Sequence, residues 1–334
     1  VLLTLLFISG NIITGLLAVP FRLLLIGLLY TYFNLFQENI LAYLRTLNKP
    51  WHFLLISAAK DLTEIALVIL LVIIWHKGAE GRIFATVITA AITFAYGVIF
   101  FYRRGFIQTQ LSKKYVKEEL RFGISQVFFL LNVFILNGAD KFLIHKIYPA
   151  DGAGLGVYFM SAQLAFVINV VVSAFFFSYQ PVLYNLLNNF TEENKFKMLR
   201  IKYLFAAGLL LCVVLLNTFI PFIYQQFING QYHPGMGYVV WNTVAYFFWG
   251  LYAVMLGFLY YYKKNSIVTV LSVFSSLVCI ISNFYFIKIW GVAGAGYANL
   301  FTYCLLFITA FIIINKTCRL QLPWIQFRKI FAKA

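Results

Sequence analysis

Charge is what this sequence has least of, and acidic charge above all. Of its 334 residues only 11% are charged, and 10 Asp and Glu stand beside 26 Lys and Arg. A soluble domain of this length exposes a large surface and needs far more charge to cover it. The scarcity of charge, with 63% hydrophobic residues and a mean hydropathy of +0.87, excludes a soluble globular protein and predicts a polytopic membrane protein.

Cysteine pairs and catalytic motifs are also missing. The four Cys occur singly, in or beside apolar runs and without a CxxC pair, so neither a disulfide framework nor a zinc site is indicated. The four His lie near the ends of apolar runs, without a partner at metal-ligand or nucleophile spacing. We therefore expect no metal, no cofactor and no enzymatic activity. The net charge of +16 is interpreted as attraction to anionic lipid, not to nucleic acid.

Long hydrophobic runs, in contrast, fill the chain. Runs of this length favour helices over barrel strands, which alternate over about 10 residues. Two prolines, Pro181 and Pro221, are expected at the ends of such helices, where a missing N–H is tolerated. The expected fold is all-α, with about ten transmembrane helices of the ~17–25 residues or slightly more that a tilted span needs: 1–19, 23–44, 51–75, 81–102, 121–143, 154–179, 202–223, 236–262, 266–289 and 291–315.

The Lys and Arg residues are divided unequally between the two sides of the membrane. When the connectors between spans are assigned to alternate sides, 19 of these residues face one side and six face the other. The remaining one, Lys60, lies inside a span. Because basic residues concentrate on the cytoplasmic side, the richer side and the C-terminus are predicted to be cytoplasmic.

An internal repeat suggests the architecture. A G-x-x-G-x-x-x-A motif begins at Gly78 and again at Gly291, each time at the start of a hydrophobic span. Both copies begin on the same side, so the repeat is parallel, and its small residues allow helix backbones to approach closely. Extrapolating the spacing places the start of the first half roughly 95 residues before Val1, enough for two helices. We therefore expect twelve helices in two six-helix lobes around a central cavity.

In this scheme the present chain holds the last ten helices. The expected domains are the last four helices of the first lobe, a cytoplasmic linker, the six-helix second lobe and a basic interfacial tail: 1–104, 105–120, 121–315 and 316–334.

The stretch Pro50–Trp75 places three ionisable residues near the middle of a span. Lys60, Asp61 and Glu64 lie 10 to 14 residues after Pro50, a depth of roughly 15–20 Å along a helix. Together they cost about 7–10 kcal/mol at the bilayer centre, whereas the apolar residues of the same span return about 4–8 kcal/mol. The charges must therefore face protein, water or a ligand. This pattern predicts a polar pathway between helices, and hence a carrier.

Five stretches together resemble a known family. They are ILAYLRTLNKPWHF at 40–53, KGAEGRIFAT at 77–86, the run from RFGISQ to QLAF at 121–166, FFFSYQPVLYN at 175–185 and GVAGAGYANLF at 291–301. Through them the chain is similar to the polysaccharide-biosynthesis or O-antigen flippases, in the superfamily that also contains multidrug and toxic-compound extrusion carriers. The resemblance implies two six-helix lobes and alternating access. It also implies transfer of undecaprenyl-pyrophosphate-linked oligosaccharide from the inner to the outer leaflet of the bacterial inner membrane, with glycan polymerase and other polysaccharide-assembly proteins as partners.

For such a cargo, Lys60 is the candidate contact of the pyrophosphate, because it is the cation nearest the middle of the membrane. The alternative is that Lys60 pairs with Glu64 one helical turn away, or with Glu38 on the neighbouring span. Asp61 and Glu64 are candidates for carrying protons if transport is coupled to an ion, because burial favours the protonated carboxyl.

A second polar cluster, Asp140 and Lys141, is expected near the outer end of its span and matches an acidic–basic pair of the family. Its alternative interpretation is an interfacial pair whose Lys reaches toward the headgroups, without a role in transport. Arg45 is interpreted as a cytoplasmic anchor or as a contact for pyrophosphate at an entry site. Amides at membrane depth are expected to form hydrogen bonds between helices: Asn34, Asn132, Asn169, Asn217, Asn242 and Asn283.

Two other functions remain open at this point. One is export of drugs or small molecules on the same fold. The other is a membrane enzyme that processes glycans, but such an enzyme normally needs a sizeable outer catalytic loop. The longest outer connector, around 225–235, is short and nearly uncharged.

Overall fold

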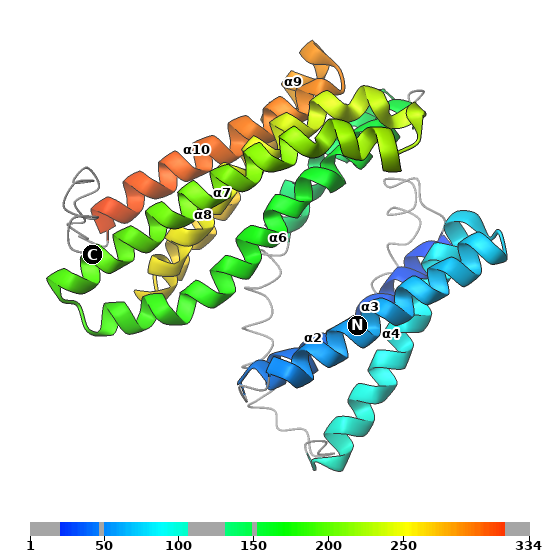
Figure 1. The fold of residues 1–334 in the computed structure, drawn as a ribbon, viewed down its shortest axis with the longest axis horizontal. Coiled ribbons are helices and arrows are strands. Elements are labelled where there is room, and N and C mark those ends of the chain that lie inside the picture. Colours follow the sequence, from blue (N-terminus) through cyan, green and yellow to red (C-terminus); the bar gives the residue numbers. More distant parts are fainter. Residues whose placement is uncertain (1–20, 47–49, 106–130, 149–151, 318–334) are drawn as a thin grey trace. The chain divides into compact units, whose positions relative to one another are not determined.

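The structure, a computed structural model, describes residues 21–46, 50–105, 131–148 and 152–317. All regular structure within these ranges is helical (Figure 1). The predicted span 1–19, most of the predicted linker and the basic tail lie outside the described residues. The chain divides into two compact units, 1–116, called unit 1 below, and 117–334, called unit 2.

Unit 1 is built from helices that pack on α4. Both α2 and α3 contact α4, and α3 passes at its end into a π-helix that also packs on α4. The elements are α2 (Phe21–Thr46), α3 (Pro50–Val68), the π-helix η1 (Ile69–Ile74) and α4 (Gly78–Arg103).

Unit 2 is organised around α8, which packs against α6, α7 and α10, while α9 packs on α10. In the most apolar stretch of α8, 61% of the residues are buried, against 17% in α7, so α8 is the inner helix and α7 an outer one. The elements are a helix over 131–147, α6 (Gly152–Asn188), α7 (Glu192–Phe227), the 3-10 helix η2 (Gly230–Gly235), α8 (Met236–Tyr261), α9 (Asn265–Trp290) and α10 (Ala293–Thr317).

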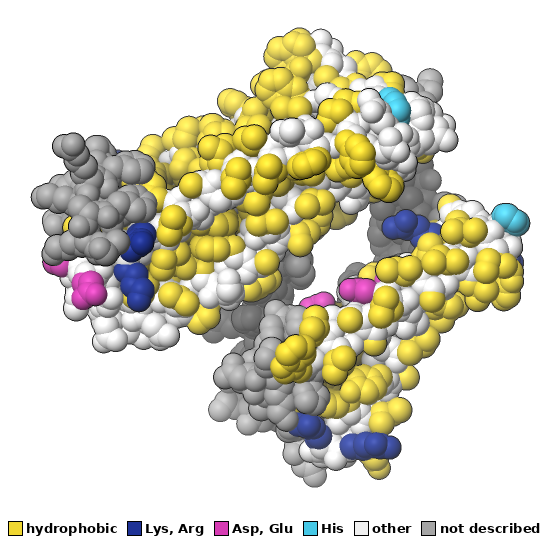
Figure 2. All heavy atoms as spheres, in the orientation of Figure 1, with side chains coloured by type: hydrophobic (Ala, Val, Ile, Leu, Met, Phe, Trp, Pro, Cys, Tyr) yellow, Lys and Arg dark blue, Asp and Glu magenta, His cyan; other side chains and the backbone are white. Residues whose placement is uncertain are grey.

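The surface of the described helices is that of a membrane protein. Six of these helices are long and apolar enough to cross a bilayer, and in Figure 2 exposed hydrophobic side chains occur along the described helices, whereas charged side chains appear at few places. Large apolar side chains such as Leu211 and Phe219 are more than half exposed, as expected where lipid is the solvent. The predicted class, an all-α polytopic membrane protein, is confirmed, whereas the number of ten spans stays a prediction.

Two prolines do not end their helices, and that expectation was wrong. Pro181 lies inside α6, which continues to Asn188, and Pro221 lies inside α7, which continues to Phe227. Beyond Pro181 the helix buries Leu183 in the core of unit 2. This packing offsets the missing backbone hydrogen bond, as neighbouring helices commonly do for prolines in membrane helices.

The two copies of the predicted repeat each begin with a glycine of positive φ. Gly78 and Gly291 both have positive φ, +55° and +62°, a conformation that glycine adopts without steric cost. The last residues of the two motifs, Ala85 and Ala298, are both completely buried. Each copy is therefore a tight turn that leads into a closely packed helix.

The second glycine of each copy lies against the end of the preceding helix. A Cβ on Gly81 would lie 3.0 Å from the carbonyl oxygen of Leu71, and a Cβ on Gly294 would overlap the carbonyl of Phe286. The two copies differ just before the turn, because η1 precedes the first, whereas α9 runs as an α-helix up to the second.

Candidate functional site

Lys60 lines a cavity between α3 and α4 in unit 1. The cavity measures about 300 Å³, and its polar wall consists of Lys60 and Thr63 from α3 with Thr89, Thr93 and Tyr96 from α4. Aliphatic side chains complete the lining. The side chain of Lys60 is partly exposed, so its ammonium is accessible within a largely apolar surrounding.

One hydroxyl in this cavity has no partner. Thr89 is 1% exposed, and its Oγ1 forms no hydrogen bond within the described part of the chain. By contrast, Thr63 donates to the carbonyl of Ala59 at 2.7 Å, and Thr93 contacts Oε1 of Gln37 at 3.5 Å. A buried polar group without a partner costs about 1–3 kcal/mol. Thr89 therefore offers a hydrogen bond to whatever polar group enters the cavity.

The acidic residues of α3 do not neutralise Lys60. Among the described residues, no ion pair joins Lys60 to Glu64, so that form of the pairing alternative is not the geometry found, whereas a pair with Glu38 stays a prediction. Glu64 instead accepts a hydrogen bond of 3.1 Å from the hydroxyl of Thr86 on α4, and Asp61 is exposed. The anion-contact role of Lys60 remains a prediction.

Glu38 and Arg45 are two further residues that the sequence predicted for this site. Glu38 is exposed on α2, and Arg45 lies near the end of the same helix. The side chain of Arg45 is outside what the structure describes, so its predicted role is unchanged.

Asp140 is the centre of a buried hydrogen-bond network in unit 2. Its side chain is 3% exposed. Oδ2 accepts a hydrogen bond from the hydroxyl of Tyr158 at 2.7 Å and from Nδ2 of Asn299 at 3.1 Å. Oδ1 accepts from the backbone N–H of Lys141 at 2.8 Å. Charge-assisted bonds of this kind are about twice as strong as neutral ones, so the carboxylate is firmly held.

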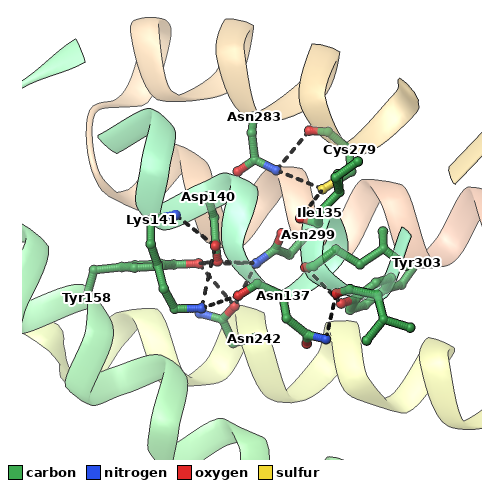
Figure 3. A network of polar contacts seen from close by, with 12 residues as sticks. Ile135, Asn137, Asp140, Lys141, Tyr158, Asn242, Cys279, Asn283, Asn299 and Tyr303 are labelled. Atoms are coloured by element: carbon green, nitrogen blue, oxygen red, sulfur yellow. Dashed lines mark hydrogen bonds and ion pairs between the residues drawn. The ribbon is translucent and has the colours of Figure 1, made fainter. Parts of the chain in front are cut away.

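Asn242 completes the network. Nδ2 of Asn299 donates to Oδ1 of Asn242 at 3.3 Å, and the hydroxyl of Tyr158 lies 3.5 Å from the same oxygen. Figure 3 shows these polar groups pointing toward one another from the helix 131–147, α6, α8 and α10. Four helices of unit 2 thus converge on the carboxylate of Asp140.

Unlike Asp140, Lys141 is partly exposed. Its ammonium lies 3.5 Å from Oδ1 of Asp140 and donates to the backbone carbonyl of Asn137 at 2.6 Å, while 27% of its side chain stays exposed. The expectation of an interfacial pair therefore fits Lys141 but not Asp140. The carboxylate of Asp140 is thus a buried acceptor held by neutral donors, with the ammonium of Lys141 beside it.

Several amides connect helices, as expected. Oδ1 of Asn132 accepts hydrogen bonds from Ser275 at 3.2 Å and from Ser276 at 2.5 Å, which join the helix 131–147 to α9. Asn217 donates to Thr243 at 2.9 Å, which joins α7 to α8. Interhelical hydrogen bonding is thereby confirmed for these two amides and for Asn242, described above.

Several residues that contact or adjoin the predicted site residues were not predicted from the sequence. Thr86, Thr89 and Thr93 are spaced three and four residues apart, a spacing that places them on one helix face. Asn299 directly follows the alanine of the second repeat copy. Tyr158 carries no such signal, because tyrosine is abundant throughout the chain.

Comparisons with known proteins agree with this geometry at the level of the fold. No protein-family model matches the chain. Lsg locus putative protein 1 of Haemophilus influenzae is 21% identical over 285 residues, which cover 82% of this chain and 69% of that protein.

Solved structures of transporters are similar to the chain. A mutant of the Vibrio cholerae MATE transporter VcmN superposes with a TM-score of 0.70 at 15% identity, covering 95% of this chain and 75% of VcmN. An outward-facing multidrug resistance MATE family transporter of the MOP superfamily gives 0.63 at 15% identity, covering 94% and 75%. The chain therefore has the fold of MATE-type membrane transporters. At this identity the likeness extends to the fold alone.

Proposed function

We propose that the protein is a flippase that moves lipid-linked oligosaccharide from the inner to the outer leaflet by alternating access. The observation that carries this proposal is the cavity of Lys60. It combines the partly exposed Lys60 with the hydroxyls of Thr63, Thr89 and Thr93, and one of its two helices, α4, is long and apolar enough to cross a membrane.

The chemistry of the cargo explains why such a cavity is needed. A pyrophosphate and a hydrophilic glycan must cross about 30 Å of hydrocarbon while the polyprenyl tail stays in lipid. A cation at membrane depth is costly by itself, and an oxyanion bound to Lys60 offsets that cost. The unpartnered hydroxyl of Thr89 supplies a further donor to the same anion, or an acceptor to a sugar hydroxyl.

Asp140 is proposed as the site of ion coupling. Its carboxylate receives hydrogen bonds from Tyr158 and Asn299, which lie on two different helices. A change of charge at this carboxylate would alter the hydrogen bonds that it accepts. It would thereby shift the equilibrium between different packings of the four helices. Asp61 and Glu64 remain predicted carriers of protons in unit 1.

The proposal includes the setting of the protein. We place it in the bacterial inner membrane with a cytoplasmic C-terminus, as a carrier without enzymatic activity. It would work with glycan polymerase and other polysaccharide-assembly proteins.

Export of drugs or small molecules on the same fold is the second candidate. The observations in its favour are the multidrug transporter among the similar structures and the apolar part of the cavity wall, which includes Leu55, Ile56 and Ile92. An amphipathic cation would not suit this site, because Lys60 repels positive charge. The charge of the exported molecule therefore separates the two candidates.

The test is complementation of a deletion strain. We expect deletion to abolish surface polysaccharide and to accumulate lipid-linked repeat units that face inward. We expect Lys60→Ala to reduce transport about tenfold or more at unchanged protein abundance, because a hydrogen bond to a charged group contributes about 1.5–3 kcal/mol. Lys60→Arg, which keeps the charge, is the matched control and should restore part of the activity.

Three other results would contradict the proposal. Full complementation by Lys60→Ala would remove this residue from the mechanism. Drug hypersensitivity of the deletion strain with normal surface polysaccharide would replace the flippase by a drug exporter. A purified protein that forms a glycan product without transport would be an enzyme instead.

A further inference from the structure

A lysine of unit 2 is buried although the positive charges around it are exposed. Lys202 lies ten residues into α7 and is 9% exposed, whereas Lys197 and Arg200 on the same helix are exposed. The Lys202 ammonium lies over the ring of Phe258 on α8, 3.8 Å from its centroid. This cation–π contact compensates part of the cost of taking the charge out of water.

Lys202 forms part of the wall of a cavity of about 200 Å³ between α7, α8 and α10. Apart from Lys202 and Tyr203, the wall is aliphatic and aromatic, and it includes Ala206, Met255 and Phe307. Cavities of about 150 Å³ with apolar walls are large enough to admit benzene. A segment of a hydrocarbon chain therefore fits this space.

The cavity opens toward lipid. Tyr203 and Ala206 are only partly buried, so the cavity reaches the surface of the unit. The face of α7 that continues from Tyr203 is apolar and exposed, with Leu210 at 51% and Val214 at 53%. A hydrocarbon chain that enters the cavity is thus continuous with the surrounding bilayer.

The end of unit 2 at which the cavity lies is basic. Phe258 is in the last turn of α8, and the short turn that follows carries Lys263 and Lys264, both exposed. Lys197 and Arg200 lie on α7, near the same end. Basic pockets between transmembrane helices near the membrane surface suit anionic lipid headgroups, because each nearby cation adds attraction.

We propose that this cavity binds an anionic phospholipid, with one acyl chain between α7, α8 and α10 and its phosphate at Lys202. The lipid would bridge three helices of unit 2 and stabilise their packing. The site differs from the one proposed for the transport cargo, because its wall comes from α7, α8 and α10 of unit 2, whereas the cavity of Lys60 is formed by α3 and α4 of unit 1.

The experiment measures lipid binding to the full-length chain purified in detergent. Phosphatidylglycerol, phosphatidylcholine and inorganic phosphate are titrated separately, and bound lipid and the melting temperature are followed by native mass spectrometry and thermal unfolding. We expect phosphatidylglycerol to bind more tightly than phosphatidylcholine and to raise the melting temperature, and phosphate alone to have no effect.

Variants then locate the site. Lys202→Gln should weaken phosphatidylglycerol binding about fivefold, the effect of one cation near the membrane surface. Lys202→Arg should retain the binding. Lys197→Gln is the matched control, since it removes an exposed charge from the same helix, and should change binding by less than about twofold. Ala206→Leu should fill the cavity and weaken the binding of either lipid.

Three results would overturn the proposal. The first is equal binding of both phospholipids that Lys202→Gln does not alter, because the headgroup would then not be recognised. The second is equal stabilisation by inorganic phosphate, which would indicate a free anion. The third is unchanged binding in Ala206→Leu, provided that this variant melts normally without lipid, because the acyl chain would then lie elsewhere.

Discussion

Two threonines occupy the same place in the two copies of the repeat and have opposite surroundings. Thr89 and Thr302 each lie eleven residues after the first glycine of their motif, and each is 1% exposed. The hydroxyl of Thr302 lies 3.1 Å from that of Ser282 on α9. The hydroxyl of Thr89 has no partner within the described residues and lines the cavity of Lys60.

The helices before the two turns explain this difference. On α9, Ser282 supplies the partner of Thr302, whereas the corresponding residue before the first turn is Ile69 of η1, which has no polar side chain. Instead, Lys60 of α3 lines the same cavity as Thr89. Small hydroxyls close a helix interface, because they satisfy one another, whereas a long charged side chain keeps it open. The same repeat thus provides a packed interface in unit 2 and an open polar site in unit 1.

The largest effect is expected at Asp140. Asp140→Ala leaves the buried donors of Tyr158 and Asn299 without their acceptor, and should destabilise unit 2 by about 3 kcal/mol or more. Asp140→Asn keeps the shape and part of the hydrogen bonding but not the charge. We expect it to fold and to lose transport, as measured by the melting temperature in detergent and by complementation. Normal transport by Asp140→Asn would show that the network is structural only.

The second effect concerns the turns of the repeat. Gly294→Ala should destabilise the protein by about 3 kcal/mol, because its Cβ overlaps the backbone at Phe286. Gly81→Ala should cost about 1 kcal/mol, because its Cβ lies 3.0 Å from the carbonyl oxygen of Leu71 and small shifts relieve the contact. Unfolding of both variants in the same detergent gives the comparison. A larger cost for Gly81→Ala would contradict this ranking.

The smallest effect in stability is expected for the two threonines. Thr302→Val should cost about 1 kcal/mol, since it removes the hydrogen bond to Ser282. Thr89→Val should leave stability unchanged or raise it slightly, because a hydroxyl without a partner is replaced by a methyl group of similar size. Thr89→Val should nevertheless reduce transport, and Thr302→Val should reduce it only as far as protein abundance falls. Equal destabilisation by the two changes would remove the contrast between the units.

Much of the fold was predictable because it rests on one-dimensional signals. Run length and scarcity of charge identify membrane helices, and the repeated motif at Gly78 and Gly291 identifies two equivalent turns. Lys60 was a candidate from the sequence because an ionisable group at membrane depth is costly unless it has a function or a partner, and Asp140 because it matches an acidic–basic pair of the similar family; the roles of both stay predictions. The residues that surround Lys60 and Asp140 could not be predicted, because they come from helices far away in the sequence, as Asn299 does for Asp140.

Which lysine side chains are buried could not be predicted from the sequence either. Sequence alone gives Lys202 and Lys197 the same role, as basic residues beside a span. Only the packing of α7 on α8 places the first over Phe258 and leaves the second exposed. The direction in which a side chain leaves a helix depends on where neighbouring helices lie, and that is a property of the tertiary structure.

By itself the sequence determined that this is a helical membrane protein with a duplicated turn and with charges inside its spans. These features follow from local hydrophobicity and from the backbone freedom of glycine, which need no knowledge of distant contacts. Tertiary structure decided which polar groups are satisfied and which are left for a ligand. Hydrogen bonds and cavities depend on distances of a few ångströms between helices, and such distances are set when the whole unit packs.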